Sequence, residues 1–228
     1  MVVALVFLTL VACVVADYLL TRRRAPAAAR QVAGAAPHVR EAKLLAGAGG
    51  VMLPEGLYYH PGHTWVAVEG TTSVRIGMDD FARRVAGPIQ ELDPPTVGRS
   101  VRQGLPIWTL RKDGQRVAML SPVDGVIEEI NPALMKDLTL VRRDPYGEGW
   151  VARIRVAELG RNLRNLLHGS VVTHWMDGAI EKLYRRFEEK LGPVMADGGM
   201  LHEDFSDMIG DEEWAAICRE HFLSDLDS

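Results

Sequence analysis

Short β-type runs separated by turn residues fill the middle of the chain, from Tyr58 to Val156. Many short strands punctuated by glycine and proline predict a mainly β domain, either a small barrel or a sandwich. One short helix is expected over Asp79–Val85, because an acidic cap begins it and Gly87-Pro88 ends it. The predicted strands are residues 63–68, 73–77, 101–110, 117–120, 125–130 and 150–156.

After Val156 the apolar residues recur at three- and four-residue spacing, which predicts helices. A second helix is expected over residues 211–222, with Trp214, Ile217 and Cys218 on its apolar side. We interpret both stripes as packing faces. Asp197-Gly198-Gly199 is the expected turn between the helices, which form either a docking hairpin for a partner or a cap over the barrel. The first stripe consists of Trp175, Met176, Ala179, Ile180, Leu183, Phe187 and Leu191.

The first twenty residues are nearly all apolar, and Asp17 is their only charged side chain. Such a run spans about 30 Å as a helix, enough to cross a bilayer. Arg22–Arg24 follow it, so the positive-inside rule places the rest of the chain in the cytoplasm. The alternatives are a cleaved signal peptide, which lacks its basic start here, and a lipoprotein signal ending at Cys13. We expect a single-pass protein of the inner (cytoplasmic) membrane.

Charge and cysteine content disfavour several classes of partner and site. A net charge of -4 and a pI near 6.0 disfavour a nucleic-acid partner. The two cysteines, Cys13 and Cys218, cannot build a disulfide framework or a metal-thiolate cluster. Residues 25–50 are rich in alanine and glycine, which indicates a linker with a transient helix over residues 39–45.

Six motifs in order and at matching spacing give the chain a family resemblance between Tyr58 and Leu167. The motifs are His63-Thr64-Trp65-Val66, Arg75-Ile76-Gly77-Met78-Asp79-Asp80-Phe81-Ala82, Gly87-Pro88-Ile89, Pro95-Thr96-Val97-Gly98, Ser121-Pro122-Val123-Asp124-Gly125 and Asp144-Pro145-Tyr146-Gly147-Glu148-Gly149-Trp150. With them the chain resembles the H protein of the glycine cleavage system. The resemblance implies a barrel-sandwich hybrid (lipoyl/H-protein-like) fold, in which a lysine at a β-hairpin tip carries lipoate to partner enzymes.

The modification site departs from the family pattern. Alignment without gaps puts Gly114 at the position of the family lysine and Arg111 at that of an acidic residue three positions before it. Asp113-Gly114 predicts a two-residue type I′ turn. Lys112 remains a second candidate for lipoate, and its alternative is a solvated turn lysine. The turn predicts the pairs Lys112 with Gln115, Arg111 with Arg116, Leu110 with Val117, Thr109 with Ala118, and Trp108 with Met119.

Other residues offer little chemistry. His60 and His63 flank Pro61-Gly62 in a predicted turn, and His63 matches an ordinary strand residue of the family, so a metal site is disfavoured. Helix capping accounts for Asp79 and Asp80. His168 and His174 form no visible triad with the lone serines. No glycine-rich phosphate loop is present.

These observations predict four segments: a transmembrane anchor over residues 1–21, an Ala/Gly-rich linker over 22–55, an H-protein-like lipoyl-type domain over 56–168, and a helical C-terminal extension over 169–228. The leading hypothesis is a membrane-anchored, non-catalytic adaptor that docks a protein partner of glycine-cleavage or related type, with no cofactor. The alternative is a lipoyl carrier of glycine decarboxylation that uses Lys112.

Overall fold

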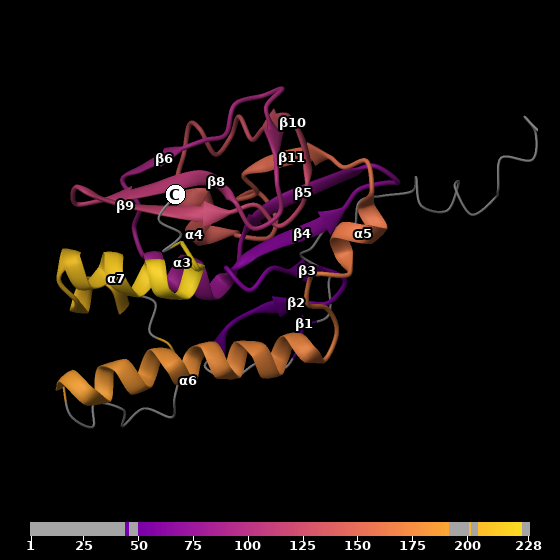
Figure 1. Cartoon of the computed structure of the whole chain (residues 1–228). Coiled ribbons are helices and arrows are strands. Elements are labelled where there is room, and N and C mark those ends of the chain that lie inside the picture. Colours follow the sequence, from indigo (N-terminus) through magenta and orange to yellow (C-terminus); the bar gives the residue numbers. More distant parts are fainter. Residues whose placement is uncertain (1–43, 46–49, 192–200, 202–204, 225–228) are drawn as a thin grey trace, which may run out of the picture. The chain divides into compact units, whose positions relative to one another are not determined.

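Antiparallel pairing organises the described residues into a larger sheet, a smaller sheet and a separate two-stranded sheet (Figure 1). This computed structural model describes residues 44–45, 50–191, 201 and 205–224. The predicted membrane anchor, most of the predicted linker and the turn at residues 197–199 lie outside the described residues. The described residues belong to one compact unit.

The larger sheet has six strands in the order β3-β4-β5-β11-β10-β7, and every neighbouring pair is antiparallel. The predicted strands over 63–68, 73–77, 125–130 and 150–156 are found in it with small changes at their ends. Its members are β3 (Tyr58–Tyr59), β4 (Thr64–Val68), β5 (Ser73–Met78), β7 (Ser100–Val101), β10 (Gly125–Ile130) and β11 (Ala152–Arg155).

The smaller sheet contains β6 (Glu91–Asp93), β8 (Pro106–Lys112) and β9 (Gln115–Leu120) in that order. The single strand predicted over residues 101–110 was wrong, because a turn divides it into β7 and β8. Leu105 N–H donates to the Arg102 carbonyl at 3.1 Å, and Gly104 supplies the positive φ of 80° that lets the chain pass between sheets.

The core of the larger sheet is built around Trp65, which is fully buried. Its indole N–H lies 3.0 Å from the Met78 carbonyl and 3.1 Å from that of Pro145. Gly77 lies opposite Trp65 in the β4–β5 register, and a Cβ there would come within 2.8 Å of the indole ring. Gly77 therefore makes room for the tryptophan, and the two motif residues form one packing unit.

The remaining elements are helices. Helix α3 (Asp80–Ala86) begins at Asp79, whose carboxylate accepts the Ala82 N–H, and ends at Gly87 with φ 65°, as the sequence predicts. The predicted C-terminal helices correspond to α6 (Val171–Leu191) and α7 (Asp211–Phe222). Three further elements are too short for a periodic signal: α4 (Thr139–Arg143), α5 (Leu159–Leu163) and the 3₁₀ helix η3 (Phe205–Met208).

The C-terminal helices share the core of the β domain. Helix α7 packs on β9 and α3 (Figure 1), and the Trp214 indole N–H donates to the Ala86 carbonyl at 3.0 Å. The buried side chains of α7 include Trp214, Ile217, Cys218 and Phe222, as its predicted apolar side requires. Of the two alternatives, α7 is therefore a cap on the β domain. Helix α6 buries Val172, Met176, Ile180 and Leu183.

The β domain begins earlier than residue 56. Val51 and Leu53 are buried in the core, and the Met52 N–H donates to the Asp80 carboxylate at 2.8 Å. The end of the predicted linker therefore belongs to the folded domain. Strand β1 (Leu44–Leu45) pairs with β2 (Leu53–Pro54), so the helix expected over residues 39–45 does not extend to its last two residues.

Within the part of the chain that the structure describes, no helix has both the length and the apolar character needed to cross a bilayer.

Replacing Trp214 with alanine tests whether α7 belongs to the fold. We expect W214A to lower the free energy of unfolding by about 3–5 kcal/mol, because it leaves a cavity and removes the bond to the Ala86 carbonyl. Met208→Ala is the control, since that side chain is 65% exposed, and should change stability by less than about 0.5 kcal/mol. Urea unfolding measures both. Equal losses in the two variants would contradict the packing of α7.

Candidate functional site

The β8–β9 hairpin carries the predicted modification site, and its geometry follows the prediction. Asp113 and Gly114 both have positive φ, 49° and 80°, as a type I′ turn requires. All five predicted cross-strand pairs are confirmed: Lys112 with Gln115, Arg111 with Arg116, Leu110 with Val117, Thr109 with Ala118, and Trp108 with Met119.

The two faces of the hairpin differ in character. Leu110, Val117 and Met119 are buried on one face. On the other, Arg111 and Arg116 would repel each other, but Asp93 of β6 lies 2.8 Å from Arg111 Nη2 and 3.6 Å from Arg116 Nη2. The sequence shows the two arginines but gives no sign of this carboxylate, because β6 is a three-residue strand.

Gly114 lies at the tip in open space. A Cβ built on it would meet no heavy atom of the described residues within 4 Å, so the backbone conformation rather than crowding favours glycine. A residue at this position has room for a long side chain, yet Gly114 has no amine to accept an acyl group.

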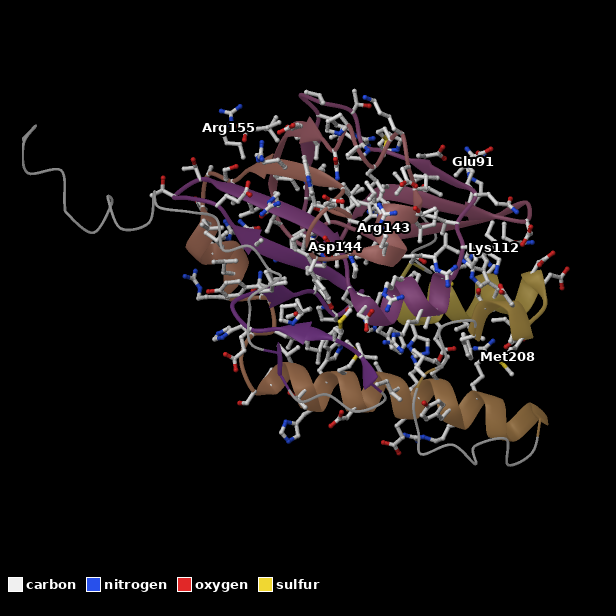
Figure 2. All side chains as sticks on the ribbon, turned by 180° about the vertical axis from the view of Figure 1, so that it is seen from behind. Glu91, Lys112, Arg143, Asp144, Arg155 and Met208 are labelled. Atoms are coloured by element: carbon white, nitrogen blue, oxygen red, sulfur yellow. The ribbon has the colours of Figure 1, made fainter. Side chains whose placement is uncertain are left out.

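Lys112 is covered by the C-terminal segment, and the prediction of a solvated turn lysine was wrong. Its side chain is 12% exposed, and Nζ lies 3.4 Å from the Ser206 carbonyl and 3.6 Å from Asp207 Oδ1. The same ammonium group lies 5.8 Å from the centre of the Trp214 ring. In Figure 2, Lys112 lies beside the end of the molecule that carries Met208. The two candidate positions therefore differ: Gly114 is accessible at the hairpin tip, whereas the ammonium group of Lys112 is engaged by the C-terminal segment.

Contacts with α3 hold this covering segment in place. A Cβ on Gly87 would come within 1.7 Å of Ser206 Oγ, so the segment approaches the α3 terminus closely. Arg84 Nη1 donates to the Leu201 carbonyl at 2.8 Å. These partners are more than a hundred residues apart in the sequence, and no local pattern predicts them.

Asp79 and Asp80 stabilise the N-terminal end of α3. Asp79 caps the helix and lies 2.9 Å from His63 Nδ1, so its capping role is confirmed. Asp80 does more than cap: it is fully buried, accepts the Met52 N–H, and forms ion pairs with Arg83 and Arg84. A buried carboxylate needs such partners.

His60 and His63 are packing residues in this structure. His63 is not a strand residue: it lies in the turn before β4 with φ 62°, and its ring stacks on Phe81 and Trp175 at 4.3 and 4.7 Å between centroids. His60 Nδ1 accepts the Gly62 N–H at 3.0 Å. Burial lowers the pKa of His60 to about 4. Among the described residues, no three histidine, cysteine or acidic side chains are placed to hold a metal ion.

Helix α7 brings two further titratable groups into the core. Burial lowers the pKa of His221 to about 3, and its Nε2 finds no hydrogen-bond partner among the residues that the structure describes. Burial also raises the pKa of the Cys218 thiol. A buried thiol with a raised pKa is a poor nucleophile, so Cys218 acts as an apolar packing residue.

The two antiparallel sheets and the hairpin with its tight tip define a lipoyl-type domain. The family model described as "Glycine cleavage H-protein" matches residues 57–177. The chain belongs to the glycine cleavage H-protein family.

Curated relatives agree with this assignment. The chain is 35% identical over 106 residues to "Glycine cleavage system H protein" of Rubrobacter xylanophilus, covering 46% of this chain and 83% of the relative. It is 35% identical over 108 residues to the protein of the same name from Thermus thermophilus, covering 47% and 84%. A crystal structure of "a glycine cleavage system H protein" from Mycobacterium marinum is 25% identical, with a TM-score of 0.43, covering 46% and 87%.

The depressed histidine pKa values predict that the fold weakens in mild acid. Below about pH 6.5, His60 and His221 are protonated in the unfolded chain but stay neutral in the folded chain. The free energy of unfolding therefore falls as the pH falls. We expect a loss on the order of 1–2 kcal/mol per histidine between about pH 7 and about pH 5.

Urea unfolding at the two pH values measures this loss. His221→Phe should make the pH dependence shallower, because it removes one titrating group. His174→Phe is the matched control, since His174 is exposed on α6 and should leave the dependence unchanged. A His221→Phe variant with the wild-type pH dependence would refute the assignment.

Proposed function

We propose that this chain is a membrane-anchored, non-catalytic adaptor of the glycine cleavage H-protein family, without lipoate. In this proposal residues 1–21 anchor it in the inner (cytoplasmic) membrane, and the lipoyl-type domain faces the cytoplasm. Its partner is a protein of glycine-cleavage or related type. The observation that carries the proposal is the hairpin tip, where the open position holds a glycine and the neighbouring amine is covered.

Attachment of lipoate requires a primary amine that a modifying enzyme can reach. Gly114, which we assign to the position of the family lysine, has none, and we assign Arg111 to the position of the family's acidic residue. The amine of Lys112 is engaged by Ser206 and Asp207 and lies next to Trp214. An acyl arm on Lys112 would have to displace η3 before it could leave the surface.

Burial of apolar side chains stabilises the C-terminal segment over Lys112. The ion pair with Asp207 contributes little by itself, because Asp207 is 58% exposed. Helix α7, by contrast, fully buries Trp214 and Phe222 against the β domain, and each such side chain contributes about 2–3 kcal/mol. Undocking α7 therefore costs several kcal/mol, and lifting η3 exposes its buried residues Phe205 and Ser206 as well.

The second candidate function is a lipoyl carrier of glycine cleavage type that uses Lys112. Family membership and the place of Lys112 at the end of β8, two residues from Gly114, favour it. This function requires η3 to lift from the hairpin, which α7 does not forbid.

Intact-mass analysis of the native full-length protein, purified separately from membrane and soluble fractions, tests the proposal. We expect the protein in the membrane fraction, with the mass of the unmodified chain. A lipoyl adduct that maps to Lys112 and is lost in Lys112→Ala would establish the carrier function instead. Recovery of the protein from the soluble fraction alone would refute the anchor and leave the adaptor function standing, so the two parts fail separately.

A further inference from the structure

The C-terminal end of α7 carries several unfavourable features. His221 is 5% exposed, yet its Nε2 finds no hydrogen-bond partner among the described residues, and neither does the buried Oγ of Ser224. Leu223 has φ 57°, in the left-handed region that a leucine adopts only at a cost. At the other end of the helix, the Trp214 indole N–H donates to the Ala86 carbonyl. The docking of α7 is therefore weakest at its last turn.

His221 packs against α3 and against the turn before β4. The centre of its ring lies 5.3 Å from that of Phe81 and 6.4 Å from that of His63. His63 in turn is bound to the buried carboxylate of Asp79 at 2.9 Å. A charged imidazole at the position of His221 would thus be buried beside aromatic rings, at a cost in desolvation.

The charged groups that face His221 do not favour a second positive charge there. Lys182 and Arg186 of α6 both lie close enough to disfavour it. Glu220, the acidic neighbour, already forms ion pairs with both of them. Burial lowers the pKa of His221 to about 3, and the nearby His63 and Lys182 add to this effect. His221 therefore stays neutral while α7 is docked.

Helix α7 can leave the β domain without breaking a strand pair. No strand of the described sheets lies in residues 205–224, so the register of the hairpin persists when α7 moves away. Such a segment can open below the free energy that unfolds the whole domain. Opening also releases η3, and Lys112 then loses its contacts with Ser206 and Asp207.

We propose that α7 is a pH-sensitive cover of the hairpin: protonation of His221 releases α7 together with η3 and uncovers Lys112, while the sheets stay folded. In the released state water surrounds the imidazole, so its pKa returns to the ordinary value of 6.5. The released fraction should therefore increase about 25-fold between about pH 7 and about pH 5. The inference stands independently of the proposed function, because the release depends on His221 whether or not Lys112 carries a group.

Hydrogen exchange of the full-length chain in non-ionic detergent, followed by mass spectrometry, tests this. Protection factors of the α7 amides, corrected for the intrinsic effect of pH on exchange, should fall about 25-fold from about pH 7 to about pH 5. Amides of β4 and β5 should stay more protected than those of α7 at both pH values. The ratio of Lys112 acetylation to that of the exposed Lys136 should rise in parallel.

Non-titrating substitutions assign the effect to His221. His221→Phe should leave a fall of less than about threefold, and His221→Asn should do the same if the phenylalanine variant does not fold. His174→Phe, on the exposed side of α6, should keep the full fall. Equal exchange of α7 and β5 amides at about pH 5, or a full fall in the His221 variants, would overturn the proposal.

Discussion

The docking of α7 on α3 and β9 is the contact that determines the surroundings of the β8–β9 hairpin. Trp214 is buried there, and its indole N–H satisfies the Ala86 carbonyl at the end of α3. Because α7 is fixed, η3 lies over the hairpin, and Lys112 is brought within reach of Ser206 and Asp207. Both ends of helix α3 therefore make contacts with distant segments. Its last turn binds Trp214, and Asp80 in its first turn accepts the Met52 backbone N–H.

This arrangement changes what an H-protein-like hairpin can do. The scaffold of the hairpin is intact, with its tight turn, its register and its buried apolar face. The tip has no amine, and the only described lysine on the hairpin is covered by a segment beyond residue 177, where the family match ends. The domain keeps the rigid hairpin but has no accessible lysine that could carry lipoate. Such a domain can still bind a partner protein, which is the basis of the proposed adaptor role.

The sequence predicted the features that depend on local physics. The Asp113-Gly114 turn determined the hairpin register, and Asp79 with Gly87 determined the ends of α3. The apolar sides of α6 and α7 followed from helical spacing. The sequence analysis did not predict β6 or the ring stacking of His63, because these depend on partners distant in sequence. It also missed the turn that separates β7 from β8, although that turn is local and contains Gly104. The contacts of Lys112 are of the same kind: Ser206 lies 94 residues away, and no local pattern links them.

The accessibility of Lys112 distinguishes a covered hairpin from an open one. In the folded full-length protein, limited acetylation followed by peptide mass spectrometry compares Lys112 with Lys136, which lies in an exposed turn. Lys136 should react at least about ten times faster, because Lys112 reacts only when the C-terminal segment opens, and the two rates should converge in urea. Equal rates in the folded protein would contradict the covered hairpin.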